Sequence, residues 1–241
     1  MIQFTTKQFG QSALYALAAS TTIVSMLFTA FFLAEPSITH GQAGPGPFEF
    51  TIQQEIIGEA SFLVAPSDVT TSGTINGLTG GNASGTTDFS VISNNATGYI
   101  VRISFEDNGT AQTMIGDTTA SEAIVDYVAS TTEPGYGYVN RTSAQFAYTV
   151  TSLTAADTDD SFLNNGTLCN SSGGSQNGAA KNAKCWMEPR VAAFDIVNRD
   201  TSAPTGATST IEFDITVPSS AVPVPSAETY TATATLTLLT Q

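Results

Sequence analysis

Long runs in which apolar and polar residues alternate one by one constrain the fold of this chain more than any other feature. Successive side chains of a β-strand point to opposite faces, so this alternation predicts strands with one buried and one solvated face. The clearest run is residues 229–238, where every second residue is a threonine and the residues between are apolar. Similar runs occupy residues 48–53, 101–106, 145–150 and 210–217.

Shorter strand candidates and turn residues complete the pattern. The shorter candidates are residues 60–64, 69–75, 87–92 and 191–197. Turn-forming pairs such as Asn76-Gly77 and Asn94-Asn95 separate the strands. About eight to ten strands with threonine-rich outer faces predict an all-β fold, an antiparallel β-sandwich of Ig-like or jelly-roll-like type. Residues 44–241 suit one such domain, because no linker or internal repeat divides them.

Helical signals in this domain are sparse. Thr119 and Glu122 have the spacing of a capping box and precede an apolar stretch, which predicts a short helix over residues 120–128. Residues 157–163 are expected to form one more helical turn. We expect both as insertions between strands.

The N-terminal region indicates export. Residues 13–34 carry no charge, follow Lys7 and precede Gly41-Gln42-Ala43, which fits the small-x-Ala pattern of a signal-peptidase site. Residues 1–43 are therefore expected to be a signal peptide, with a hydrophobic helix, or an uncleaved membrane anchor, since the apolar run is long enough to span a bilayer. A third alternative is a pilin-like leader cut after Gly10. All three place the domain outside the cytoplasm, secreted or at the cell surface.

Charge and histidine content exclude several functions. The net charge of −14, from 21 acidic and 7 basic residues, excludes a nucleic-acid binder. The only histidine, His40, precedes the expected cleavage site, so the mature domain has no Ser-His-Asp or Cys-His catalysis and no imidazole metal site. Carboxylate catalysis needs two acids in one cleft, and nothing in the sequence selects a pair. We therefore expect a protein that is not an enzyme.

The two cysteines agree with export. Cys169 and Cys185 flank a loop rich in glycine, asparagine and serine. In an exported chain this arrangement predicts a disulfide. Trp186 is expected to pack on that disulfide or in the core.

Two groups of residues are candidates for ligand binding. Asp157, Asp159 and Asp160 form the densest cluster of oxygen ligands, which suits calcium, while the alternative is that these acids cap a helix N-terminus. Tyr136 and Tyr138 lie in a glycine-rich segment and, if exposed, would stack on sugar rings; the alternative is that they cover an edge of the sandwich. A second acidic patch, Glu106-Asp107-Asn108, is either a hairpin turn or a weaker calcium site.

Several stretches spread over residues 50–238 resemble a family of exported proteins of unknown function from candidate-phylum bacteria (Patescibacteria). The stretches are FTIQQEIIGEASFLV, TINGLTGG, ASEAIVDY, FDIVNRDTSAPTGATSTIEFDITVP and YTATATLTL. The last of them is also similar to the final strand of spore-coat-U-like and WxL-type surface proteins, although the only tryptophan, Trp186, is followed by Met187 and Glu188 and so makes no Trp-x-Leu motif. The resemblance implies an exported β-sandwich and supplies no functional residue.

Together these features predict a non-enzymatic exported protein of the cell surface: an envelope component, an adhesion module or a filament subunit. The alternative is an extracellular module that binds a carbohydrate or another small ligand, with calcium as the cofactor that its acids would suit. The partners expected are other surface proteins, further copies of the chain or glycans, and no nucleic acid. Contact with a membrane is expected only through residues 13–34, if they stay uncleaved.

Overall fold

The computed structural model describes residues 19–23, 25–26, 51–129 and 133–241. The chain divides into two compact units, Met1–Gln54 and Glu55–Gln241. In the first unit, residues 19–23 and 25–26 are helical. The expected cleavage site and the rest of the expected hydrophobic helix lie outside the described residues. None of the helical stretches that are described has the length and apolar character needed to cross a membrane.

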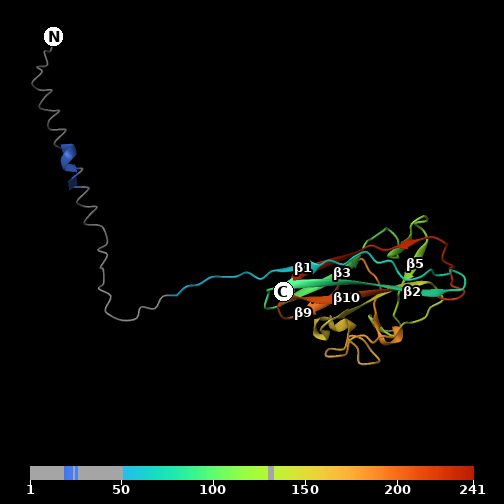
Figure 1. The fold of residues 1–241 in the computed structure, drawn as a ribbon. Helices are drawn as coiled ribbons and strands as arrows, with labels where there is room; N and C mark the ends of the chain where they lie inside the picture. The colour runs from blue at the N-terminus through green and yellow to red at the C-terminus, as the bar shows by residue number, and fades with distance from the viewer. Residues whose placement is uncertain (1–18, 24, 27–50, 130–132) are drawn as a thin grey trace, which may run out of the picture. The chain divides into compact units, whose positions relative to one another are not determined.

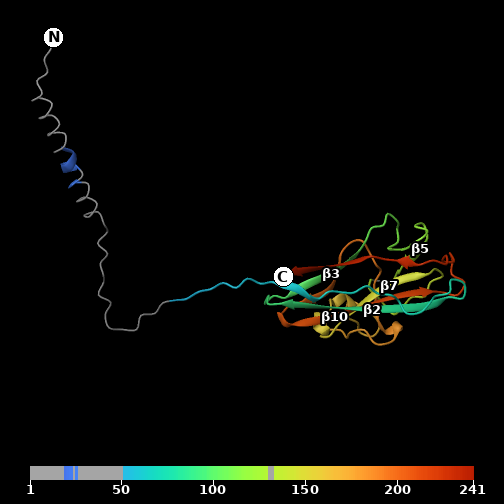
Figure 2. The same ribbon diagram turned by 45° about the horizontal axis from the view of Figure 1, so that its top comes forward.

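The second unit is built mainly from β-strands, as the alternation predicted (Figures 1 and 2). Its longer strands are β1 (Ala60–Val64), β2 (Gly81–Ser93), β3 (Tyr99–Phe105), β7 (Gln145–Ser152), β9 (Phe194–Arg199), β10 (Ala203–Val217) and β12 (Ala234–Thr240). Its shorter strands are β4 (Met114–Gly116), β5 (Ala123–Asp126), β6 (Gly135–Tyr136), β8 (Cys185–Trp186) and β11 (Tyr230–Thr231). Three 3₁₀ turns join them: η1 (Ala155–Asp157), η2 (Asp160–Phe162) and η3 (Lys181–Ala183).

The strands form three sheets. A seven-stranded sheet has the order β1-β2-β10-β7-β5-β4-β11, a three-stranded sheet has the order β12-β3-β9, and β6 pairs with β8. The pairings are antiparallel except that β5 runs parallel to β7, which departs from the purely antiparallel sheet that we expected.

The core lies between the seven-stranded and three-stranded sheets. Apolar side chains of β3 and β7 that alternate in the sequence are buried together in it. Phe105 of β3 contacts two residues of β7, with ring centroids 6.0 Å from Phe146 and 5.6 Å from Tyr148. Burial of such side chains supplies the main driving force for folding.

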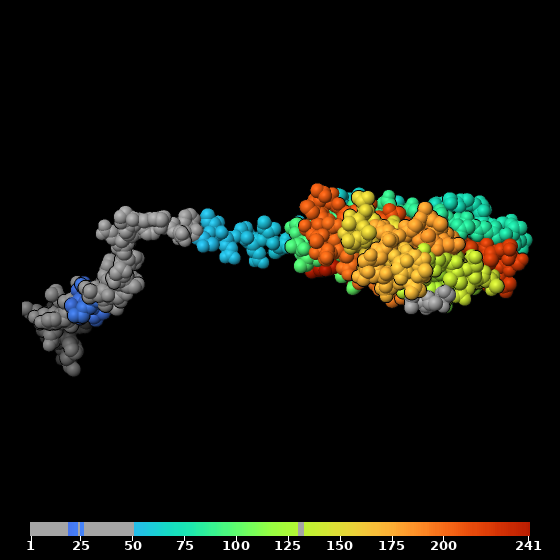
Figure 3. Space-filling model, turned by 90° about the horizontal axis from the view of Figure 1, so that it is seen from below, coloured from blue at the N-terminus to red at the C-terminus, as the bar shows by residue number. Residues whose placement is uncertain are grey.

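Strand β7 is buried on both faces, whereas its alternating sequence predicted one solvated face. The residues that point away from the main core, Gln145, Ala147 and Thr149, are at most 2% exposed. They are covered by the segment between the two cysteines and by a second apolar cluster of Tyr127, Tyr138 and Trp186. Residues 169–185 are called the Cys loop below; in Figure 3 they lie within the gold and orange surface.

The long alternating run near the C-terminus is two strands rather than one. Its first part, β11, pairs with β4 in the seven-stranded sheet. Its second part, β12, pairs with β3 along its whole length, from Ala234 opposite Phe105 to Thr240 opposite Tyr99. Alternation reports which face a side chain occupies and not which partner a strand selects, so it does not mark this change of sheet.

Three other expectations are corrected. The helix expected over residues 120–128 is absent, because a turn closed by the Glu122 N–H on the Thr119 carbonyl (2.8 Å) is followed directly by β5. Its β-branched residues Ile124 and Val125 suit a strand, and Ile124 is buried there. Residues 69–75 and 51–53 form no strand. The turn expected over residues 157–163 is present as η1 and η2.

Candidate functional site

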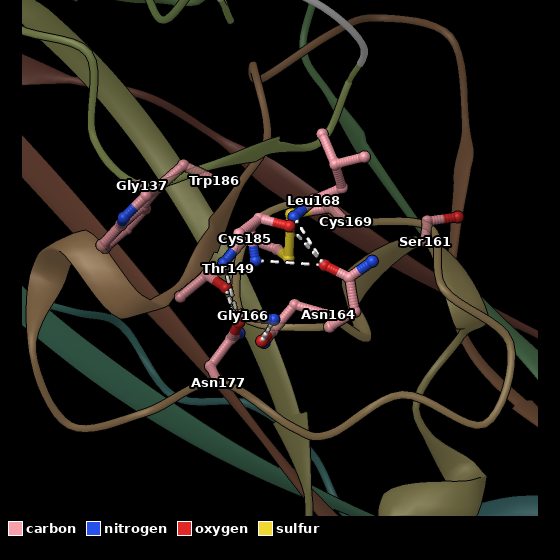
Figure 4. Close-up of a disulfide and its surroundings, with 12 residues drawn as sticks. Gly137, Thr149, Ser161, Asn164, Gly166, Leu168, Cys169, Asn177, Cys185 and Trp186 are labelled. Atoms are coloured by element: carbon pink, nitrogen blue, oxygen red, sulfur yellow. Dashed lines mark hydrogen bonds between the residues drawn. A yellow bond between two sulfur atoms is a disulfide. The ribbon is translucent and has the colours of Figure 1, made fainter.

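The predicted disulfide between Cys169 and Cys185 is present, with a Cα–Cα distance of 5.9 Å (Figure 4). Both cysteines are buried, and Trp186, beside Cys185, lies in the second apolar cluster. Asn177 holds the Cys loop against β7, since its amide donates to Thr149 Oγ1 (2.6 Å) and its Oδ1 accepts from the Cys185 N–H (2.7 Å). The disulfide therefore fixes a structural layer on the sheet.

Two of the three aspartates considered for calcium have other partners. Asp157 is buried and forms an ion pair with Arg199 at 2.5 Å. Asp159 caps η2 by accepting from the Ser161 N–H at 3.0 Å, which is the capping alternative. Among the described residues no three His, Cys, Asp or Glu side chains are placed to hold a metal ion, so the structure does not bring Asp157, Asp159 and Asp160 together as ligands.

The two tyrosines considered for sugar stacking are not both on the surface. Tyr138 is only 8% exposed, because it packs against Tyr127 and Trp186 with ring centroids 5.1 and 5.6 Å away. Tyr136, in β6, is half-buried against the main core. The two tyrosines thus fit the alternative prediction, in which these residues cover the sheet rather than form an exposed aromatic pair.

A different feature, a pocket with an acidic lining, is the strongest candidate for ligand binding. It has a volume of about 310 Å³ and lies where segments after β3, before β4, in β5 and after β8 meet. Its polar lining includes Glu106, Asp107, Gln112, Asp126, Glu188 and Arg190. Val125, Val128 and Val191 add apolar surface. Drug-sized ligands occupy pockets of this volume.

Two carboxyl groups of this acidic pocket have altered proton affinity. Burial raises the pKa of Asp126 to about 6, although hydrogen bonds from the Thr113 hydroxyl (2.7 Å) and N–H (2.9 Å) oppose the shift. Burial also raises the pKa of Glu188, and the neighbouring Glu133 raises it further, while Arg190 lowers it. Desolvation favours the neutral form of a carboxyl group, which explains both directions.

Arg190 partly neutralises the acidic pocket. Its guanidinium forms ion pairs with Glu133 and with Glu188, the latter at 2.9 Å. Glu106, Asp107 and Asp126 form no ion pair among the described residues. The pocket thus offers acceptor oxygens and unbalanced negative charge, which suit a small ligand with an amino group and hydroxyl groups.

Sequence reasoning found only part of this pocket. It singled out Glu106 and Asp107 as an acidic patch but did not connect them with Asp126 or Glu188, which are distant in the sequence. No spacing rule relates residues that only the strand order brings together. Comparison with known proteins adds no assignment, since no protein family matches the chain and a search of curated proteins found no match.

Proposed function

We propose that this chain is a non-enzymatic exported protein whose domain stands outside the cytoplasm as an envelope component, an adhesion module or a filament subunit. The observation that carries the proposal is the buried disulfide between Cys169 and Cys185. Structural disulfides persist in oxidising compartments and are rare in the cytosol. The uncharged run over residues 13–34 supports the same location.

The architecture suits a rigid display module. The domain is interpreted as a β-sandwich of Ig-like or jelly-roll-like type, because the seven-stranded and three-stranded sheets share one core. Side chains of the Cys loop anchor it to β7. A carboxyl group with an altered pKa is not sufficient evidence for a pair of catalytic acids. The proposal therefore includes no enzymatic step.

Protease treatment of intact cells that make the native protein tests the location. Peptides from residues 55–241 should be released from the cell surface, or the domain should be found in the medium. Non-reducing mass spectrometry should find Cys169 joined to Cys185. A domain that becomes accessible only after lysis, with both thiols free, would contradict the proposal.

The acidic pocket favours a second candidate function, recognition of a small extracellular ligand. An amino sugar fits its chemistry, since the ammonium group would face Asp126 and Glu106 while hydroxyl groups bond to the remaining acceptors. Titration with glucosamine should shift NMR signals of pocket residues, and glucose, which lacks the amine, should not. The double variant Asp126→Asn/Glu106→Gln should lose the response. Equal responses to both sugars, or none, would exclude this candidate.

A further inference from the structure

A lysine of the Cys loop meets an asparagine and an aspartate on the face of the seven-stranded sheet that points away from the main core. Thr216 of β10 lies directly opposite Asn82 of β2 in the strand register. Asp214 lies two residues before Thr216 and therefore on the same face. Lys181, from η3, reaches all three side chains.

The hydrogen bonds within this group bring the amine of Lys181 into contact with the side-chain amide of Asn82. Lys181 Nζ donates to Asn82 Oδ1 at 2.5 Å and forms an ion pair with Asp214. Asn82 Nδ2 donates to the other oxygen of Asp214 at 3.1 Å. Asp214 thus touches both nitrogen atoms, the one on lysine and the one on asparagine.

The surroundings hold Lys181 in place and limit water around it. The Asp214 side chain is 3% exposed and that of Lys181 is 28% exposed. The Lys181 ammonium lies 3.5 Å from the ring centroid of Tyr138, and Trp186 Nε1 donates to the Lys181 carbonyl at 2.8 Å. Burial lowers the pKa of Lys181, although hydrogen bonding and charge from Asp214 oppose the shift. Loss of the proton is what makes a lysine nucleophilic.

We propose that Lys181 and Asn82 become joined by an intramolecular amide bond, with Asp214 as the group that carries the proton. Asp214 first takes a proton from the Lys181 ammonium with which it is paired. The neutral amine then attacks Asn82 Cγ, and a new C–N bond forms. Asp214 delivers its proton to Nδ2 and takes the second proton that the attacking nitrogen loses. The old C–N bond of Asn82 breaks, and ammonia leaves as ammonium with that second proton. No oxidant, reductant or cofactor is needed, and Asp214 is restored.

One further contact and the exposure of Asn82 fit this reaction. Thr216 Oγ1 donates to Asn82 Oδ1 at 2.6 Å, which is where negative charge develops when the amide is attacked. Asn82 is on the exposed side of the group, which gives the departing ammonia a path to water. Asn82 is the acyl partner and Asp214 is not, because an ionised carboxylate resists attack by an amine.

The bond would tie the Cys loop to β2, across a sequence separation of 99 residues. It would act in addition to the disulfide, which closes only the loop itself. The inference does not depend on where the protein is located, so its test is separate from that of the proposed function.

Mass spectrometry of the full chain, purified folded and then reduced, tests the proposal. The wild-type protein should be lighter than its sequence by one ammonia, about 17 Da, because a covalent amide has replaced two side-chain groups. Peptide mapping should find Lys181 joined to Asn82. An unchanged mass, a loss of water (about 18 Da, the sign of a Lys–Asp bond) or peptides that separate freely would overturn the proposal.

Variants separate the bond from other losses of ammonia. Lys181→Arg keeps the ion pair with Asp214 but cannot form the amide, so its full sequence mass is expected. Asp214→Asn should also keep its full mass, with folding checked by circular dichroism. Lys184→Arg is the matched control, since Lys184 lies in the same loop but pairs with Glu212, and it should still lose ammonia. A loss of ammonia that persists in Lys181→Arg would overturn the assignment.

Discussion

Asp126 illustrates, at the scale of a residue, how the fold sets the chemistry of a carboxyl group. Its side chain accepts two hydrogen bonds from Thr113, and its backbone N–H donates to Gln112 Oε1 at 2.5 Å. These contacts place it in the wall of the acidic pocket, where burial raises its pKa from 3.8 to about 6. The folded state therefore binds this proton more tightly than the unfolded state does.

This shift predicts a pH dependence of stability. A carboxyl group whose pKa is higher in the folded state than in the unfolded state stabilises the fold at a pH below its unfolded-state pKa. This contribution is lost as the pH rises through its folded-state pKa. The Asp126 contribution to the free energy of unfolding should thus decline between pH 3.8 and about 6. Urea unfolding should show a smaller decline in Asp126→Asn, and the exposed control Asp117→Asn should behave as wild type. Identical profiles for both variants would contradict the shift.

The disulfide supports a second prediction at this scale. Replacing Cys169 and Cys185 together by alanine should lower the free energy of unfolding by about 3 kcal/mol, since a loop of this size is no longer closed in the unfolded chain. Urea unfolding of the double variant checks this value. Wild type treated with a reductant is the control and should unfold at a similar midpoint. A midpoint unchanged in both cases would show that the loop is held by its other contacts alone.

At the scale of elements, β12 shows how side-chain alternation becomes packing. Leu236 and Leu238 are half-buried against the core, whereas Thr235 and Thr237 between them are exposed. Pairing with β3 fixes which of the two sets faces inward. The strand is thus a part of the chain's own three-stranded sheet.

A matched pair of variants tests this arrangement. Leu236→Ala/Leu238→Ala should lower stability by about 2 kcal/mol or more, because each change removes buried methyl groups. Thr235→Ala/Thr237→Ala changes the same strand on its exposed face and should alter stability by less than about 1 kcal/mol. Thermal unfolding measures both. Equal melting temperatures for the two variants would contradict the orientation of β12.

The elements also show what the sequence could and could not predict. Strands with strong alternation, such as β3 and β7, were predicted correctly because the period of the side chains is a local property. The prediction that the outer face of β7 is solvated was wrong. The Cys loop covers this face, and the alternation within β7 carries no information about a segment that is distant in the sequence. The capping-box spacing near Thr119 was overridden by strand pairing of Ile124. The acidic pocket was not predicted for the same reason. Its residues are distant in the sequence, and only the order of the strands brings them together.

At the scale of the whole molecule, the domain is expected to fold without the first unit. No residue before Ala60 is among the core residues described, and the seven-stranded sheet begins with β1. Residues 55–59 still matter, because the Glu59 N–H donates to Asn94 Oδ1 at 2.7 Å.

A truncation tests this independence. A protein that begins at Glu55 should have the same melting temperature as one that begins at Gly44, because the described core residues begin at Ala60. Calorimetry of both proteins provides the comparison. A protein that begins at Asn94 would lack β1 and all of β2 and is expected not to fold. A clearly lower melting temperature for the protein that begins at Glu55 would show that the boundary is misplaced.

The passage of residues 230–240 from one sheet to the other has a consequence for the timing of folding. When the chain emerges with its N-terminus first, β3 and β4 are exposed long before their partners β12 and β11 are available. Neither sheet can reach its full width until these late residues have emerged. For the export proposed above, this late completion would keep both sheets unfinished until the last strands of the domain have crossed the membrane.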